Sequence, residues 1–368
     1  MLYIPCAPVG NVSDMDMSAR RAPIRTSVAV GLVALVALVA PACSSSDPEA
    51  SSEPSESSGG SLVVYSGRSE ALVAPLMDQF TETTGIELQV RYGDSADLAL
   101  VIDQEGDNGR ADVFFSQSPG ALGYLTSKDR LAVLPDDLLD LVPEADRSSA
   151  GTWVGVSARA RVLVYNPEMV SEADLPASVL DLTGPDYTGK VGVAPTNGSF
   201  IDFVSGLRSE LGDEAAASWL AGMADNDAPN YANNNAVLEA VDRGEVPFGL
   251  VNHYYLVKAR EENPDINVEN YFFPAEDSGS LLLVSAAGIT ATATNLDQAE
   301  QFVEFLLSTE SQQYFADETF EFPLVEGIDP SGGLPPLAEL PVRRLDLDTL
   351  GGELTSSIEM IRESGLQR

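Results

Sequence analysis

The sequence predicts an α/β protein with two lobes and a ligand-binding cleft between them. Its 368 residues are enough for two domains of ordinary size, and hydrophobic residues make up 44% of the chain. From Leu62 onward, short apolar runs alternate with segments whose apolar residues recur at helical spacing. Because this alternation is typical of strands joined by crossover helices, we expect each lobe to be a mixed, mostly parallel sheet flanked by helices.

The first six predicted elements follow a regular β-α order. Residues 62–65 are an apolar run ended by Ser66-Gly67, which predicts a buried strand and a turn. Residues 71–83 have apolar side chains on one helical face, and residues 86–90 alternate as a strand does. The order continues with a helix at 98–104, a strand at 111–115 and a helix opened by Pro119.

The same order returns in the rest of the chain, without a tandem sequence repeat. Apolar runs predict strands at 162–165, 191–194, 248–251 and 281–284. Helical spacing predicts helices at 200–211, 214–223, 236–241, 296–307 and 354–364. We expect Trp153 and Trp219 in the core. Ligands of open α/β sheets gather at the carboxyl ends of strands, so polar residues there are candidates for a binding site.

The amino-terminal residues indicate export and lipid anchoring. Arginines precede an apolar run at 28–40, which has the length of the core of a signal peptide. Small residues then precede Cys43, as in a lipobox, although Ala40 stands where leucine is usual. We therefore expect residues 1–42 to be a signal peptide and Cys43 to be lipidated. A plain signal peptide with an incidental cysteine is the alternative. Asp14 and Asp16 do not suit a signal peptide and favour Met17 as the true start.

Residues 44–61 contain no apolar residue larger than alanine and are rich in serine, glutamate, proline and glycine. Such a segment cannot bury enough surface to fold, so we expect residues 43–61 to be a lipidated cysteine followed by a flexible tether. This predicts an exported folded body, extracellular or periplasmic, held at the outer face of the cell membrane.

Composition excludes several classes of function. The formal net charge of −37 disfavours nucleic acid as a partner. The only cysteines, Cys6 and Cys43, precede the folded body, so a cysteine zinc site is excluded there. His253 is the single histidine, which excludes a multi-histidine metal site and leaves no convincing nucleophile and base for an enzyme.

The strongest local motif is the adjacent pair Tyr254 and Tyr255, directly after a predicted strand. Fe(III) is a small, hard cation that prefers oxygen ligands, and a bound trivalent ion favours the phenolate form of tyrosine. At a corner between strand and helix, both rings can converge on one point. Taken alone, the pair is better explained by packing at the start of a helix. We expect His253 to pack or to support the site rather than to bind a metal.

Six segments resemble the ferric-ion-binding proteins of bacterial ABC importers, and the resemblance runs from about Leu62 to the carboxyl terminus. They are VVYSGR at 63–68, ADVFFS at 111–116, RARVLVYN at 159–166, APTNGSF at 194–200, YANNNAVLEAV at 231–241 and VNHYYL at 251–256. The resemblance implies a two-lobed periplasmic-binding-protein fold that closes on its ligand by hinge bending.

The resemblance also implies site residues. Tyr254 and Tyr255 match the iron ligands of the family, and Tyr165 matches a third tyrosine ligand found in a subset. The family binds a synergistic anion, carbonate or phosphate, beside the metal. The matching positions are Thr196, Asn197, Gly198, Ser199, Asn234 and Asn252. A glycine-containing loop that opens a helix is a suitable anion site.

Two departures leave the ligand open. Ser69 stands where some relatives have a histidine ligand, and Gln117 stands where they have a glutamate. The tyrosine-rich form of the site remains, in which Arg68, with Arg159 or Arg161, pairs with carbonate. The alternative hypothesis keeps the fold and binds a phosphonate, a polyamine or another small organic solute.

We expect the chain to cross between lobes near residues 157–161, 284–288 and 335–340. The amino-terminal lobe would comprise 62–158 with 287–337, and the carboxyl-terminal lobe 159–286 with 338–368. The resemblance implies a monomer that delivers Fe(III) to the permease subunits of an ABC importer.

Overall fold

A computed structural model of the chain describes residues 61–117, 119–344 and 354–367. The predicted signal peptide and lipidated Cys43 lie outside the described residues, as does the predicted tether apart from Ser61, which begins the first strand. None of the described helices combines the length and apolar character that a membrane crossing requires.

The first part of the chain forms the predicted alternation of strands and helices. Its elements are β1 (Ser61–Ser66), α1 (Glu70–Thr84), β2 (Glu87–Tyr92), α2 (Ser95–Glu105), β3 (Val113–Ser116), α3 (Pro119–Ser127) and α4 (Asp136–Leu139). β1 pairs in parallel with β2 on one side and β3 on the other. α1 ends at Gly85, which adopts a left-handed conformation (φ 73°) and donates its backbone N–H to the carbonyl of Thr81.

The rest of the chain is less regular than the sequence predicted. Its elements are β4 (Val154–Tyr165), β5 (Val191–Gly192), α5 (Gly198–Leu211), α6 (Asp213–Asp225), α7 (Asn234–Asp242), β6 (Phe248–Asn252), α8 (Tyr254–Glu262), β7 (Glu269–Tyr271), β8 (Leu281–Ile289), α9 (Leu296–Leu306), α10 (Thr309–Glu318), β9 (Phe322–Pro323), β10 (Arg343–Arg344) and α12 (Leu354–Glu363). The predicted strands at 162–165 and 281–284 are the ends of the longer β4 and β8.

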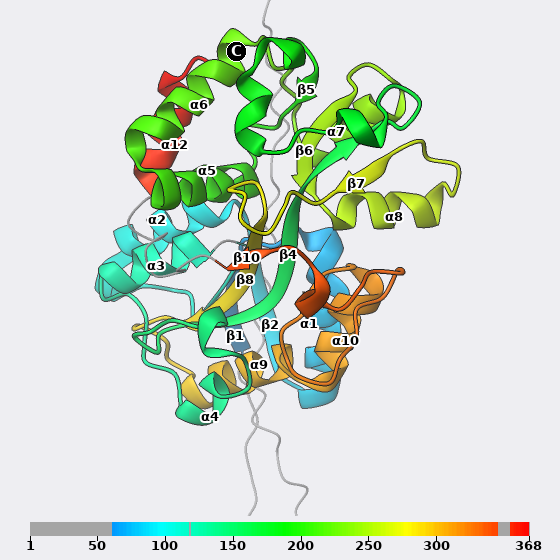
Figure 1. The fold of residues 1–368 in the computed structure, drawn as a ribbon. Coiled ribbons are helices and arrows are strands. Elements are labelled where there is room, and N and C mark those ends of the chain that lie inside the picture. The colour runs from blue at the N-terminus through cyan, green and yellow to red at the C-terminus, as the bar shows by residue number, and fades with distance from the viewer. Residues whose placement is uncertain (1–60, 118, 345–353, 368) are drawn as a thin grey trace, which may run out of the picture. The chain divides into compact units, whose positions relative to one another are not determined.

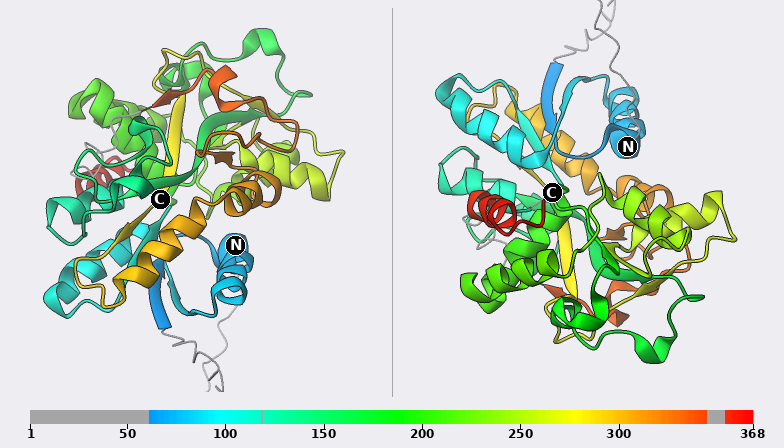
Figure 2. Two further views of the ribbon diagram at one scale, coloured as in Figure 1. Left: turned by 90° about the horizontal axis from the view of Figure 1, so that it is seen from below. Right: turned by 90° about the horizontal axis from the view of Figure 1, so that it is seen from above.

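β4 connects the two halves of the body (Figure 1). The described strands lie side by side in the order β2-β1-β3-β8-β4-β6-β5. The two neighbours of β4 in this order, β8 and β6, both run antiparallel to it. Residues 154–160 of β4 pair with β8, whereas residues 161–165 pair with β6. The strand therefore changes partners halfway along its length. Figure 2 shows helices on both sides of β8. The lobe boundaries given above remain a prediction.

Aromatic side chains fill the core on each side of this connection. The ring of Phe80 in α1 lies 5.0 Å from that of Phe302 in α9. The ring of Phe203 in α5 lies 5.5 Å from that of Trp219 in α6. Trp153 is fully buried and Trp219 is nearly so, which confirms both as core residues.

Candidate functional site

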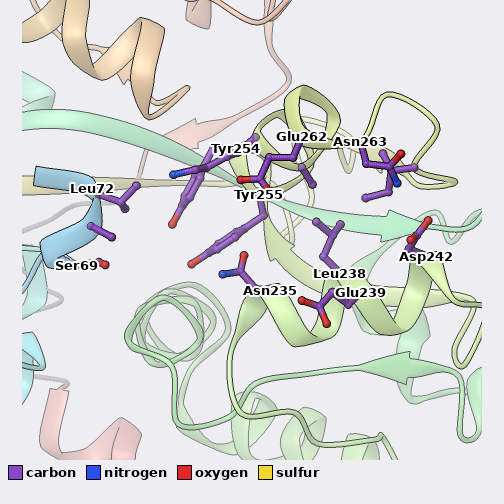
Figure 3. A pocket seen from close by; sticks show the side chains of 14 residues that line it. Ser69, Leu72, Asn235, Leu238, Glu239, Asp242, Tyr254, Tyr255, Glu262 and Asn263 are labelled. Atoms are coloured by element: carbon purple, nitrogen blue, oxygen red, sulfur yellow. The ribbon is translucent and has the colours of Figure 1, made fainter.

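Two tyrosines lie side by side where β6 passes into α8. β6 ends at Asn252, His253 precedes the helix, and Tyr254 and Tyr255 begin it. Their rings stack with centroids 4.3 Å apart and planes inclined by 27°. Neighbouring residues of a strand point to opposite faces, but helical neighbours differ by only about 100°. The change from strand to helix therefore sends both phenols toward the segment that holds Ser69 (Figure 3).

A cavity of about 480 Å³ lies beside the two rings. The start of α1 and the helices α7 and α8 line it, so segments far apart in the sequence share it (Figure 3). Its lining side chains include Ser69, Leu72, Asn235, Leu238, Glu239, Lys258 and Glu262. Figure 3 shows the amide of Asn235 to the right of the hydroxyl end of Tyr255, at about the same height in the view.

Burial governs the chemistry of Tyr254. This side chain is 3% exposed. Burial, then Tyr255 and Glu321, raise its pKa well above 10, while Arg159 and Arg68 act in the opposite direction. The phenol is therefore neutral at physiological pH unless a cation displaces its proton.

His253 supports the corner from which the tyrosines project. Its ring is fully buried, accepts the N–H of Ala160 at Nδ1 (3.1 Å) and donates from Nε2 to the carbonyl of Phe320 (2.9 Å). The ring also stacks on Phe322 with centroids 4.5 Å apart. Burial lowers its pKa to about 4, so the ring is neutral. Both ring nitrogens are occupied, as expected for a packing role.

Three arginines are buried around the tyrosines. Arg68 follows β1, and Arg159 and Arg161 point from β4. Arg68 forms an ion pair of 2.6 Å with Glu321, and both side chains are fully buried. Arg159 donates from one terminal nitrogen to the carbonyl of Gln117. Within the described chain, Nε and Nη1 of Arg68 and of Arg159 have no hydrogen-bond partner. Buried donors without partners are costly, which points to an acceptor from outside the chain.

Arg161 belongs to a hydrogen-bonded network that contains four of the predicted anion-binding residues. Its guanidinium donates to the Ser199 hydroxyl and to the Asn252 side-chain carbonyl, each at 3.3 Å. Asn234 donates to Ser199 (3.2 Å) and to Asn197 (3.3 Å). Asn197 is the N-cap of α5 and accepts the backbone N–H of Ser199 at 3.0 Å.

Two side-chain amide atoms of this network have no hydrogen-bond partner among the described residues. Among the described residues, none hydrogen-bonds to Oδ1 of Asn234 or Nδ2 of Asn252, although both atoms are buried. Burial lowers the pKa of Arg161 to about 9, and nearby Tyr255 and Asp202 only partly oppose this. Its cationic form would gain from an anion in the site.

A second cavity of about 350 Å³ adjoins Arg68 and the amino-terminal end of α5. Thr196, Asn197 and Gly198 line it together with Gln117. The structure thus brings the loop predicted to bind the anion close to the arginine predicted to pair with it.

Tyr165 is not brought to the other two tyrosines. It lies opposite Phe248, at the start of β6, whereas Tyr254 follows the other end of that strand. Four strand residues separate these ends, or about 13 Å. Burial, then Glu172 and Glu269, raise the pKa of Tyr165. Tyr165 therefore has different surroundings from the tyrosine pair.

Sequence reasoning missed Glu321, the fully buried partner of Arg68. It sits between Phe320 and Phe322, just before the two-residue strand β9. The available signal was a single charged residue between two phenylalanines. Among the described residues, no group of three or more histidine, cysteine, aspartate or glutamate side chains is placed to hold a metal ion. Oxygen donors to a cation here would come from the tyrosines.

The fold is that of a solute-binding protein, the two-lobed periplasmic-binding-protein fold. The chain belongs to a family described as bacterial extracellular solute-binding proteins, whose model matches residues 108–348. The family expected from the sequence is confirmed, and its members are binding proteins rather than enzymes.

Several relatives are named for iron. The chain is 31% identical to the Fe(3+)-binding periplasmic protein of Serratia marcescens, over 83% of this chain and 90% of that one. The structure resembles iron-bound HitA from Pseudomonas aeruginosa with a TM-score of 0.79 and 34% identity, over 83% of this chain and 99% of that one. It resembles FutA from Trichodesmium, solved with iron and citrate ligands, with a TM-score of 0.72 and 27% identity, over 84% of this chain and 100% of that one.

Proposed function

We propose that this protein binds Fe(III) outside the cytoplasm and delivers it to the permease of an ABC importer. The observation that carries the proposal is the stacked pair Tyr254 and Tyr255, which lines a cavity. Buried Arg68 and Arg159 are near enough to act on the charge of Tyr254, and their Nε and Nη1 groups have no partner in the described part of the chain. The relatives named for ferric iron support the same cargo. Two phenolates offer Fe(III) the hard oxygen ligands it prefers, and they neutralise two of its three charges.

A synergistic anion would complete the coordination of the metal. Carbonate or phosphate is the expected anion, held by Arg68 and Arg161 and by the network at the start of α5. The unpaired Nε and Nη1 atoms of Arg68, with Nδ2 of Asn252, are donors suited to it. The predicted positions Thr196, Asn197, Gly198, Ser199 and Asn234 lie in the same region.

The rest of the transport function follows from the predicted organisation of the chain. We propose a monomer that closes on iron by rotation of its lobes and then docks on the permease. A lipid on Cys43 and a flexible tether would keep the body near the membrane, which raises its effective concentration at the permease.

An optical titration tests the proposal. Fe(III) supplied as a weak chelate, in carbonate buffer, is expected to produce a visible tyrosinate-to-iron charge-transfer band that saturates at one ion per protein. A protein that stays colourless with both carbonate and phosphate would contradict iron binding. Binding of a phosphonate or another organic solute by that iron-free protein would then favour the alternative cargo.

Iron affinity is expected to fall as the pH is lowered. Tyr254 is neutral in the iron-free protein because burial raises its pKa, so the metal must displace its proton. If each of the two tyrosines releases one proton when iron binds, the apparent affinity for iron changes by up to about 100-fold per pH unit. Competition with a chelator of known proton affinity between pH 6 and 8 measures the slope. A slope of zero would show that no phenol is deprotonated on binding.

A further inference from the structure

Glu321 occupies a position that the proposed iron and anion ligands do not explain. Its carboxylate is fully buried, 2.6 Å from Arg68, and accepts a further hydrogen bond from the hydroxyl of Ser157. Ser157 in turn lies 2.6 Å from Ser285, so the carboxylate is tied to both β4 and β8. Burial opposes its charge, but Arg68 and Arg159 outweigh this effect and lower its pKa. Glu321 is therefore ionised.

The backbone before Glu321 is held in an unusual conformation. Phe320 has a left-handed φ of 55°, a strained conformation that is rare for a bulky residue. His253 donates to the carbonyl of Phe320 (2.9 Å), and the N–H of Glu321 donates to the carbonyl of Phe315 (3.0 Å). These bonds fix the turn that directs the carboxylate inward. The same histidine precedes Tyr254, so one side chain connects Glu321 to the tyrosine corner.

Glu321 fixes Arg68 by one end only. The ion pair uses Nη2, while Nε and Nη1 remain without a partner in the described part of the chain. Arg159 is held in a similar way through its bond to Gln117. A guanidinium anchored at one corner presents its other donors in a fixed direction, which lowers the entropy lost on binding a ligand.

The buried charges also define what kind of ligand would neutralise the site. Arg68, Arg159 and Arg161 contribute three positive charges, against the carboxylates of Glu321 and Asp202. One positive charge is left. Fe(III) bound to two phenolates adds one more, so a dianion brings the whole site to neutrality. Without Glu321 the same count would call for a trianion.

We infer that Glu321 is a positioning residue that orients Arg68 and lowers the positive charge of the site, which makes the site prefer a dianion to a trianion. This inference rests on the ferric-ion function and the synergistic anion proposed above, and it adds the residue that sets the preference among anions. Uncompensated charge is costly in a buried site, so the preference for a dianion comes from the protein and not only from the metal.

Two substitutions of Glu321 separate its charge from its geometry. Iron retained by the full chain against a competing chelator is measured from the tyrosinate band, once with carbonate and once with citrate as the added anion. Glu321→Gln keeps the shape and removes the charge, and it is expected to lower the carbonate-to-citrate retention ratio by about tenfold or more. Glu321→Asp keeps the charge but shortens the side chain. It is expected to weaken retention with both anions and to leave their ratio unchanged.

Glu318→Gln, an exposed change three residues away in α10, is the matched control and should alter neither quantity. An unchanged ratio in Glu321→Gln overturns the role in charge, and wild-type retention in Glu321→Asp overturns the role in positioning. If Glu321→Gln does not fold, Arg68→Gln must raise the carbonate-to-citrate ratio, and failure to do so overturns the inference. A wild-type protein without a tyrosinate band would instead overturn the ferric-ion proposal itself.

Discussion

Replacing Tyr254 and Tyr255 together by phenylalanine is expected to abolish the charge-transfer band and iron retention. The substitution removes only the two hydroxyl groups and keeps the stacked rings, so the fold should survive. Changes in residues around a metal ligand already cost about 10- to 100-fold in affinity, so loss of one phenolate should cost at least about 100-fold. Titration of each single variant and of the double variant, followed in the visible range, measures these losses.

Tyr165→Phe is the matched control for the tyrosine pair. The same hydroxyl is removed, but from the opposite end of β6, where Tyr165 faces Phe248 in the pairing of the strands. We expect the band and the affinity to be unchanged. A large loss in Tyr165→Phe would show that the third ligand implied by the family resemblance joins the site when the protein holds iron. Persistence of the band in the double variant would instead assign iron to other residues.

Replacing Arg161 by methionine is expected to lower anion-dependent iron retention by about 100-fold. Removal of one member of a buried, hydrogen-bonded charged network typically costs about 2 to 5 kcal/mol. Arg161 contacts Ser199 and Asn252 directly, so its loss also frees the start of α5 and the end of β6. The measurement is iron retention as a function of carbonate concentration, where the variant should need far more carbonate than the wild type.

Arg208→Met provides the comparison for this arginine. Arg208 is also largely buried, but it pairs with Asp213 (2.9 Å) and bonds to Ser357 (2.9 Å), away from the tyrosines. Its loss should lower the thermal stability and leave the carbonate dependence intact. Equal carbonate dependence in both variants would mean that Arg161 acts only on stability.

The order of elements could be predicted because it depends on local patterns. Apolar runs and helical spacing identified β1 to β3 and the helices between them, and Pro119 does open α3. Residues 154–161 of β4 were missed because Arg159 and Arg161 interrupt the apolar pattern of the strand. Buried arginines in a strand are understandable only once the strand is seen to border the proposed anion site.

The candidate site could be predicted in part for a similar reason. The tyrosine pair and the Asn197 loop are continuous in sequence and match a known family, so they were found. Glu321 is far from Arg68 in the chain, and its partner is chosen by the approach of β9 to β4. A single glutamate between phenylalanines gives no indication of that partner.

The sequence by itself determined the class of fold, the family and the pair of adjacent phenols, because these depend on local periodicity and on short contiguous motifs. Only the tertiary structure decided which charges meet. It placed Arg68, Arg159 and Arg161 around the tyrosines, paired one of them with Glu321 and left Tyr165 elsewhere. The physical reason is that Coulomb energy in a buried site depends on distances of a few ångströms between residues far apart in the chain.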